Sequence, residues 1–159
     1  MKALSVRPKM GYFIAAGIKQ EVQRSWMTDY IGDILIYTSN SIKDKSYVCG
    51  HAICVVELYD ITKQAPNVYI WHIRNVRFIE PFPVKFRRHL CDVEDDRIIN
   101  MKMPKGYRKP GGFGITVKQP DGRRKQIFNS FTYALNHWID IGLFYFPKVK
   151  IVDPPTGLF

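Results

Sequence analysis

The chain has no long apolar run, few cysteines and a deficit of acidic residues. No stretch reaches the roughly 18 apolar residues that a membrane-spanning helix needs, so we expect no membrane partner. Arg7, Pro8 and Lys9 interrupt the start of the chain, which therefore does not look like a signal peptide. The three cysteines cannot all pair with one another, which favours a reducing compartment. These absences predict a cytoplasmic protein.

Sequence motifs that would define a cofactor or metal site are missing as well. The glycine-rich segment 111–114 lacks the Lys-Ser/Thr that completes a phosphate-binding loop. Cys49 and Cys54 are five positions apart, so on a regular strand they face opposite sides and cannot share a zinc ion. We therefore expect no metal and no cofactor.

Positive charge is abundant and unevenly distributed. The 159 residues include 24 Lys and Arg against 14 Asp and Glu, which gives a net charge of +10. Residues 1–80 hold 10 basic and 7 acidic side chains, whereas residues 81–159 hold 14 and 7. A basic surface attracts phosphate-rich partners, although charge alone identifies no ligand and also serves solubility.

The apolar pattern of the first part predicts an α+β fold. Strands are expected at 3–7, 34–37, 50–58 and 68–79, and a helix at 9–16 that is capped by Gly17. Strand 50–58 is apolar almost throughout, which indicates burial on both faces, as in a β-barrel. In strand 68–79, strict alternation places Trp71, Ile73, Asn75 and Arg77 on one face.

The second part predicts a basic β-hairpin and a helix. Strands 113–118 and 123–128 flank the turn sequence 119–122, and Asn129 or Ser130 can cap the helix that follows. The apolar stripe of this helix consists of Phe131, Ala134, Leu135, Trp138 and Ile139. Around the hairpin, the candidates for contacts with a nucleic-acid backbone are Lys105, Arg108, Lys109, Arg123, Arg124 and Lys125. The alternative is a solvated turn.

Residues 17–26, with the sequence Gly-Ile-Lys-Gln-Glu-Val-Gln-Arg-Ser-Trp, carry the most distinctive chemistry of the chain. Lys19 and Arg24 repel each other and are difficult to bury, so they are suited to binding an anion, with Trp26 as a stacking surface. Glu57 interrupts an apolar strand, where a carboxylate is costly unless it is paired. The alternatives are an ion pair of Arg24 with Glu57 or Glu21, and packing of the tryptophan in the core.

Several fragments, taken in order, resemble the ASCH family of the PUA-like superfamily. They are residues 3–8, 17–19, 24–26, 32–36, 55–58, 71–77 and 81–84. The resemblance implies a PUA-like mixed β-barrel with flanking short helices over residues 1–88. Residues 89–159 then form a basic C-terminal extension with the hairpin and helix, either as a separate domain or packed on the barrel. Residues 107–139 are also similar to the DNA-contacting modules of phage integrases and AP2 proteins.

The ASCH resemblance implies a cleft with Lys19, Arg24 and Glu57 as its polar residues, and with Trp26 as a stacking surface we expect these residues to bind a nucleotide, with RNA favoured over DNA as the partner. Some relatives hydrolyse acylated cytidine with a lysine, a hydroxyl and a glutamate. Val22 occupies the position of the hydroxyl here, which favours binding over catalysis.

Two alternatives to nucleic-acid binding remain. The first is a hydrolase acting on RNA or on a modified nucleoside, a ribonuclease or an amidohydrolase. In the amidohydrolase, Lys19 is the catalytic amine and Glu57 the proton shuttle. The second is a scaffold that binds protein partners through exposed aromatic residues such as Phe144, Tyr145 and Phe146.

Overall fold

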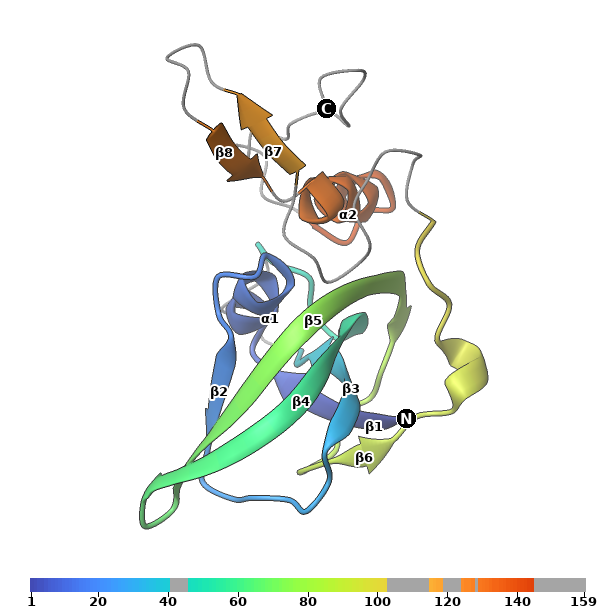
Figure 1. Ribbon diagram of the computed structural model, residues 1–159. Coiled ribbons are helices and arrows are strands. Elements are labelled where there is room, and N and C mark those ends of the chain that lie inside the picture. Colours follow the sequence, from blue (N-terminus) through green and yellow to red (C-terminus); the bar gives the residue numbers. More distant parts are fainter. Residues whose placement is uncertain (41–45, 103–114, 119–123, 128, 145–159) are drawn as a thin grey trace.

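The computed structural model describes residues 1–40, 46–102, 115–118, 124–127 and 129–144, and its main element is a six-stranded mixed sheet (Figure 1). The sheet has the strand order β2-β5-β4-β3-β1-β6. Its strands are β1 (Lys2–Val6), β2 (Glu21–Arg24), β3 (Gly32–Thr38), β4 (His51–Ala65), β5 (Val68–Pro83) and β6 (Cys91–Asp92). The parallel pair β1–β3 is joined through α1 (Pro8–Ala15), and all other pairs are antiparallel. The predicted α+β class is confirmed at this coarse level.

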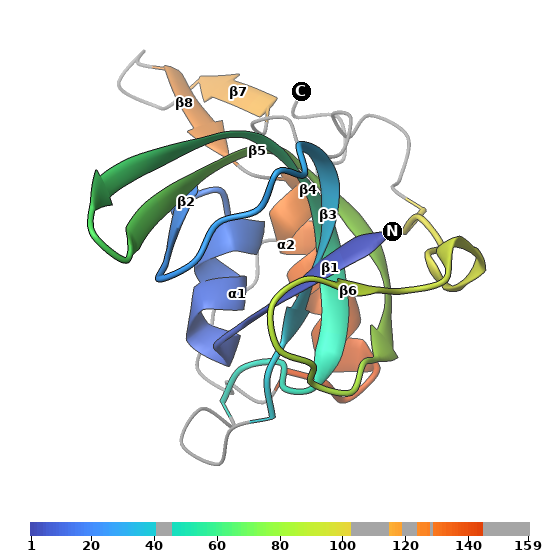
Figure 2. The same cartoon turned by 90° about the horizontal axis from the view of Figure 1, so that it is seen from below.

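The sheet curls around α1, which packs on β3, β4 and β5 (Figure 2). Pro8 stands at the first turn of the helix, where its missing N–H costs nothing. The C-cap residue is Ala16, and Gly17, one residue beyond the predicted cap position, follows it with a φ of 78°, a conformation that glycine adopts readily.

The six-stranded sheet is not closed into a barrel, so the expected closure is wrong. β2 and β6 are the two edge strands, and β6 covers only Lys2 and Ala3 of β1. Within the described parts of the chain, no strand pairs with the outer edge of β2. A side chain spans the gap instead, because Arg24 on β2 donates a hydrogen bond from Nη2 to the carbonyl oxygen of Ser5 on β1 at 2.7 Å.

Burial of β4 on both faces, which suggested a barrel, comes from two separate core clusters. Ile53, Val56 and Leu58 belong to the cluster that includes α1 and α2 residues. Ala52 and Val55 belong to a second cluster, which Cys91 and Val93 help to cover. A strand between two packed layers has the same apolar pattern as a strand in a barrel wall, and the sequence of one strand cannot distinguish them.

β5 contains a β-bulge that changes which of its residues share a face. Arg74 lies opposite Glu57 and Arg77 opposite Val55, so β5 has one extra residue between these positions. Asn75, within the bulge, has a φ of 57°. The prediction that Asn75 and Arg77 share a face with Trp71 is therefore wrong, because the bulge interrupts the alternation.

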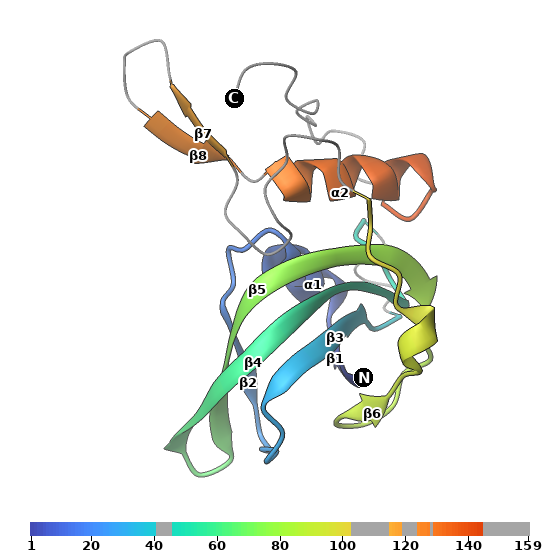
Figure 3. The ribbon, with the colours of Figure 1, turned by 45° about the vertical axis from the view of Figure 1, so that its right-hand side comes forward.

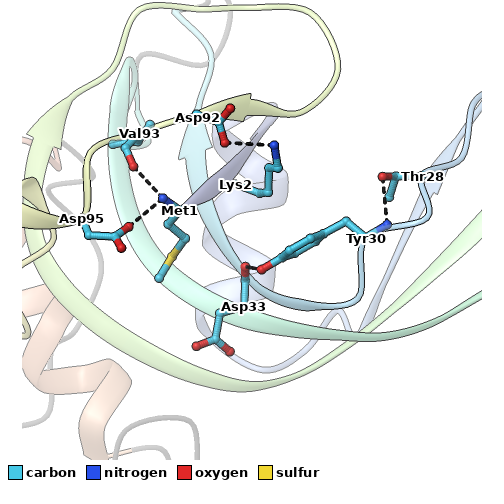
Figure 4. A network of polar contacts seen from close by, with 8 residues as sticks. All are labelled: Met1, Lys2, Thr28, Tyr30, Asp33, Asp92, Val93 and Asp95. Atoms are coloured by element: carbon cyan, nitrogen blue, oxygen red, sulfur yellow. Dashed lines mark hydrogen bonds and ion pairs between the residues drawn. The ribbon is translucent and has the colours of Figure 1, made fainter.

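The segment after β5 is tied back to β1 by polar contacts (Figure 4). The N-terminal amine donates to the carbonyl oxygen of Val93 and to Asp95, both at 2.6 Å. Lys2 pairs with Asp92 at 3.0 Å. These contacts fix the path of the chain beyond β5, including η2 (Asp95–Arg97), a short 3-10 helix.

The hairpin and helix of the second part are present as elements. β7 (Ile115–Lys118) pairs with β8 (Arg124–Ile127), and α2 (Asn129–Asp140) lies across β5 (Figure 3). Phe131, Ala134, Leu135 and Trp138 of the predicted stripe are buried, whereas Ile139 is 36% exposed. His137 also contacts Glu80 of β5 at 2.7 Å. Residues beyond 88 thus share a core with the sheet, and their division into a separate domain stays a prediction.

No helix in the described segments is long and apolar enough to cross a membrane. Phe144 is only 3% exposed, so the expectation that it forms an exposed contact for protein partners is wrong. Tyr145 and Phe146 lie outside the described residues.

Candidate functional site

A cavity of about 400 Å³ lies where β1 and β2 fail to pair, and we call it the β1–β2 cavity. Its volume falls in the range of pockets that hold a small organic ligand. The walls come from the end of β1, the end of β2 and the loop that follows β5. The lining residues are Leu4, Ser5, Val6, Arg7, Arg24, Ser25, Trp26, Ser39, Phe86, Arg88 and His89.

Arg24 is the most firmly held cation of this cavity. Its Nη1 donates to the carbonyl oxygen of Gln23 at 2.9 Å, and its Nη2 donates to that of Ser5 at 2.7 Å. Burial lowers the pKa of the guanidinium, but an arginine stays charged in proteins. A guanidinium has five N–H donors, so donors remain for a ligand after these two bonds.

Arg7 and Arg88 add two exposed guanidiniums from two other segments. Neither has an ion pair with a carboxylate in the part of the chain that the structure describes. None of the described residues that line the cavity is an aspartate or a glutamate. Three like charges around one cavity without a counter-charge favour an anionic ligand.

Three residues with aromatic rings, Trp26, Phe86 and His89, also line the cavity. Trp26 packs edge-on against Trp71 at 4.7 Å and lies against the His89 ring at 4.5 Å, measured between ring centroids. Trp71 is fully buried, and its Nε1 donates to the Trp26 carbonyl oxygen at 3.3 Å. Phe86 is 58% exposed, so its ring has a free surface on which a base could stack.

The structure brings together only two of the four residues predicted for one cleft. Arg24 and Trp26 line the β1–β2 cavity. Lys19 is exposed just before β2 and is not among the lining residues. Val22 is a core residue, 1% exposed, opposite Trp71 in the β2–β5 ladder.

Glu57 belongs to a different polar group, which we call the Glu57 cluster and which consists of Glu57, Tyr59, Arg74 and Asn75. Arg74 donates to both carboxylate oxygens, at 3.2 and 3.0 Å, and Asn75 donates to Oε1 at 2.8 Å. Hydrogen bonds from Arg74 and then Asn75 lower the pKa of Glu57. The Arg74 guanidinium also lies 4.3 Å from the centre of the Tyr59 ring.

The predicted ion pair between Glu57 and Arg24 is therefore wrong, because the bulge in β5 brings Arg74 to the carboxylate instead. Glu21, the other expected partner of Arg24, faces His72 at 3.8 Å. The carboxylate inside this apolar strand does have a cationic partner, as expected, although the Glu57 side chain is 31% exposed. The partner comes from the neighbouring strand, whose register the sequence does not reveal.

The predicted backbone contacts of the second part fall mostly outside the described residues. Lys105, Arg108, Lys109 and Arg123 are in this group. Arg124 and Lys125 lie on β8, opposite Lys118 and Val117 of β7. Their role in nucleic-acid binding stays a prediction.

Sequence reasoning missed the loop after β5 as part of the site. Residues 85–89, Lys-Phe-Arg-Arg-His, place three cations and a histidine around one aromatic residue, and all five are exposed. This combination of cations with an aromatic residue is typical of nucleic-acid contacts. It follows the proline-rich end of β5. The composition of this run can be recognised in the sequence, although its position beside Arg24 cannot.

Metal-binding groups are not apparent in the described residues, where no three His, Cys, Asp or Glu side chains cluster. Burial raises the pKa of the Cys54 thiol to about 12, which keeps it protonated and a poor ligand. Neither a model of a known protein family nor a curated protein matches the chain. Function is therefore inferred from the chemistry of the β1–β2 cavity.

Proposed function

We propose that this chain is a nucleic-acid-binding protein that holds one nucleotide of a strand in the β1–β2 cavity. The observation that carries the proposal is the set of three arginines, Arg7, Arg24 and Arg88, that line a cavity without a lining aspartate or glutamate. Arginine forks match phosphate oxygens in geometry and in charge. The exposed ring of Phe86 beside them supplies a surface for a base.

A protein ligand would need a different surface. An acidic peptide would satisfy the charges, but a cavity of about 400 Å³ with an exposed aromatic ring matches a nucleotide, which joins a flat base to a phosphate. The preference for RNA rests on the ASCH-like pattern of residues 3–85. Membership in that family and a PUA-like architecture are part of the same proposal.

Binding is favoured over hydrolysis by the positions of the two residues that a hydrolase would use. The Glu57 carboxylate accepts hydrogen bonds from Arg74 and Asn75, and it lies outside the set that lines the cavity. Lys19 is outside that set as well. Since a catalytic base must come within hydrogen-bond reach of its substrate, this pair does not support turnover in the β1–β2 cavity.

Fluorescence anisotropy with single-stranded RNA and DNA of one sequence tests the proposal. We expect affinity to fall steeply as salt rises, because counterions are released on binding. The double variant Arg7→Ala/Arg88→Ala should lose about 30-fold or more in affinity, from two charge-assisted contacts of about 1 kcal/mol or more each.

The matched control is Lys85→Ala/Arg87→Ala. It removes the same charge, but neither side chain lines the cavity, and a loss of only about two- to threefold is expected from the weaker long-range attraction. Equal losses of affinity in the two double variants would show that the interaction depends on net charge alone and would refute a specific site in the cavity. No binding to either nucleic acid at low salt would refute the proposed function altogether.

A further inference from the structure

We infer that the β1–β2 cavity recognises a phosphomonoester, the group at a phosphorylated end of a strand, in preference to an internal phosphodiester. This inference rests on the proposed function and names the part of the nucleic acid that the cavity takes. It follows from the charge of the cavity, from the hydrogen bond between Arg24 and Ser5, and from the three separate segments that supply the arginines.

The charge balance favours a dianion. Three arginines are among the residues that line the cavity, and none of the lining residues in the described chain is an aspartate or a glutamate. A phosphodiester carries one negative charge, whereas a phosphomonoester with a second pKa of about 6 carries about −1.5 to −2 at pH 7. The monoester also presents three terminal oxygens as acceptors, which suits three separate donors.

The hydrogen bond between Arg24 and Ser5 favours the end of a strand as the ligand. Arg24 belongs to β2 and Ser5 to β1, so their 2.7 Å hydrogen bond joins the two walls across the gap in the sheet. An internal nucleotide needs a way in and a way out for the chain on both sides. A terminal nucleotide needs one opening, whereas a strand that passed between β1 and β2 would have to break the Arg24–Ser5 bond.

The three arginines come from independent segments, which makes a chance surface cluster a poor explanation. Arg7 precedes α1, Arg24 ends β2, and Arg88 lies in the loop after β5. Arg7 is the N-cap residue of α1, and it makes no side-chain cap hydrogen bond, so its guanidinium is not used by the helix. Ser25 and Ser39 line the same cavity, and a serine hydroxyl can donate to a further phosphate oxygen.

Matched oligonucleotides test the inference. Single-stranded RNAs of one sequence are prepared with a 5′-phosphate, a 3′-phosphate or hydroxyls at both ends, each with its dye at the end that is not varied. We expect one phosphorylated form to bind about tenfold tighter than the hydroxyl form, which corresponds to about 1.4 kcal/mol. The preference should shrink at pH 5, where the monoester is mostly monoanionic.

Two single variants provide the internal control. Arg88→Ala should reduce the preference for the phosphorylated end to about twofold, because it removes a cavity guanidinium. Arg87→Ala removes the adjacent guanidinium, which does not line the cavity, and should keep the preference. Both side chains are exposed, so neither variant is expected to unfold the protein, and circular dichroism checks this.

The outcomes separate the two proposals. Equal, salt-dependent binding of all three RNAs overturns the phosphomonoester inference and leaves the proposed function intact. Binding of a free nucleoside monophosphate without binding of any RNA supports phosphomonoester recognition and refutes the nucleic-acid function. If a phosphorylated end is preferred but Arg88→Ala keeps the preference, the recognition lies outside the β1–β2 cavity and the inference is overturned.

Discussion

Arg74 and the three arginines of the β1–β2 cavity differ in what surrounds them. In the Glu57 cluster, Arg74 donates to both oxygens of the Glu57 carboxylate and lies against the Tyr59 ring, so its charge has a partner within the fold. In the β1–β2 cavity, Arg7 and Arg88 have no carboxylate partner among the described residues, and Arg24 is held by backbone carbonyls alone. A cation with an ion-pair partner within the fold has a structural role, whereas a group of cations without such a partner favours the binding of an anion.

The largest effect should come from Arg24→Ala. The change removes the central guanidinium of the cavity and its hydrogen bond to Ser5, and we expect affinity for the preferred RNA to fall by about 100-fold or more. Stability should fall by about 1–2 kcal/mol, because the Ser5 carbonyl oxygen loses a partner in a partly buried place. Binding isotherms and urea denaturation measure the two quantities.

The control for this change is Arg24→Lys, which retains the charge without the fork. We expect an affinity between those of the wild type and Arg24→Ala, since a lysine binds phosphate as a point charge. Wild-type affinity in Arg24→Ala would place the binding site elsewhere and remove the contrast between Arg74 and the cavity arginines.

A smaller loss is expected from Phe86→Ala. Base stacking on an aromatic side chain contributes about 1–3 kcal/mol, so affinity should fall roughly tenfold. The ring is 58% exposed, and the free energy of unfolding should stay within about 0.5 kcal/mol of the wild type. Phe86→Trp should retain affinity, and a loss as large as that of the alanine variant would argue against stacking.

The Glu57 cluster should affect the pH dependence of stability and hardly affect binding. Hydrogen bonds from Arg74 and Asn75 lower the pKa of Glu57, so the ionised carboxylate stabilises the fold above its unfolded-state pKa of about 4.3. That stabilisation is lost as pH falls through the lower folded-state pKa. In Glu57→Gln, the urea midpoint should therefore drop less between pH 6 and pH 3 than in the wild type.

Binding of RNA by Glu57→Gln at pH 7 should lie within about twofold of the wild type, because the cluster is distinct from the cavity. A loss of tenfold or more without loss of structure would contradict the separation of the cluster from the cavity. An unchanged pH dependence would show that the Glu57 hydrogen bonds do not contribute to stability in solution.

The smallest effect is expected from Lys19→Ala. The side chain is exposed and does not line the cavity, so affinity should change by less than about twofold. Removal of the charge should leave the salt dependence almost as steep. A tenfold loss would bring Lys19 into the site and give new support to the hydrolase alternative, which an assay for release of acyl groups from acylated cytidine would then test.

Local sequence features predicted local structure well. Gly17 follows the C-cap of α1 in a positive-φ conformation, and Phe131, Ala134, Leu135 and Trp138 form the buried stripe of α2, because helix periodicity and capping depend on neighbouring residues. Arg24 and Trp26 were also identified, because two cations as close in sequence as Lys19 and Arg24 are difficult to bury and a tryptophan follows them.

Features that depend on the pairing between segments were predicted poorly. The bulge at Asn75 brings Arg74 to Glu57, and no pattern in a single sequence marks where an extra residue enters a ladder. The sheet was wrongly expected to close into a barrel, because burial of a strand on both faces has more than one cause. Arg88 joins Arg24 only through the path of the chain beyond β5, which contacts such as Lys2–Asp92 fix at long range.

Resonances of the arginine side chains provide the most direct test of the central claim. An NMR titration of the Nε–Hε groups with a 5′- or 3′-phosphorylated RNA reports on Arg74 and on the cavity arginines in one sample. The account predicts that the signals of Arg7, Arg24 and Arg88 shift on saturation while those of Arg74 and Arg87 stay in place. Shifts confined to Arg74 or Arg87, with the three cavity arginines unmoved, would contradict it.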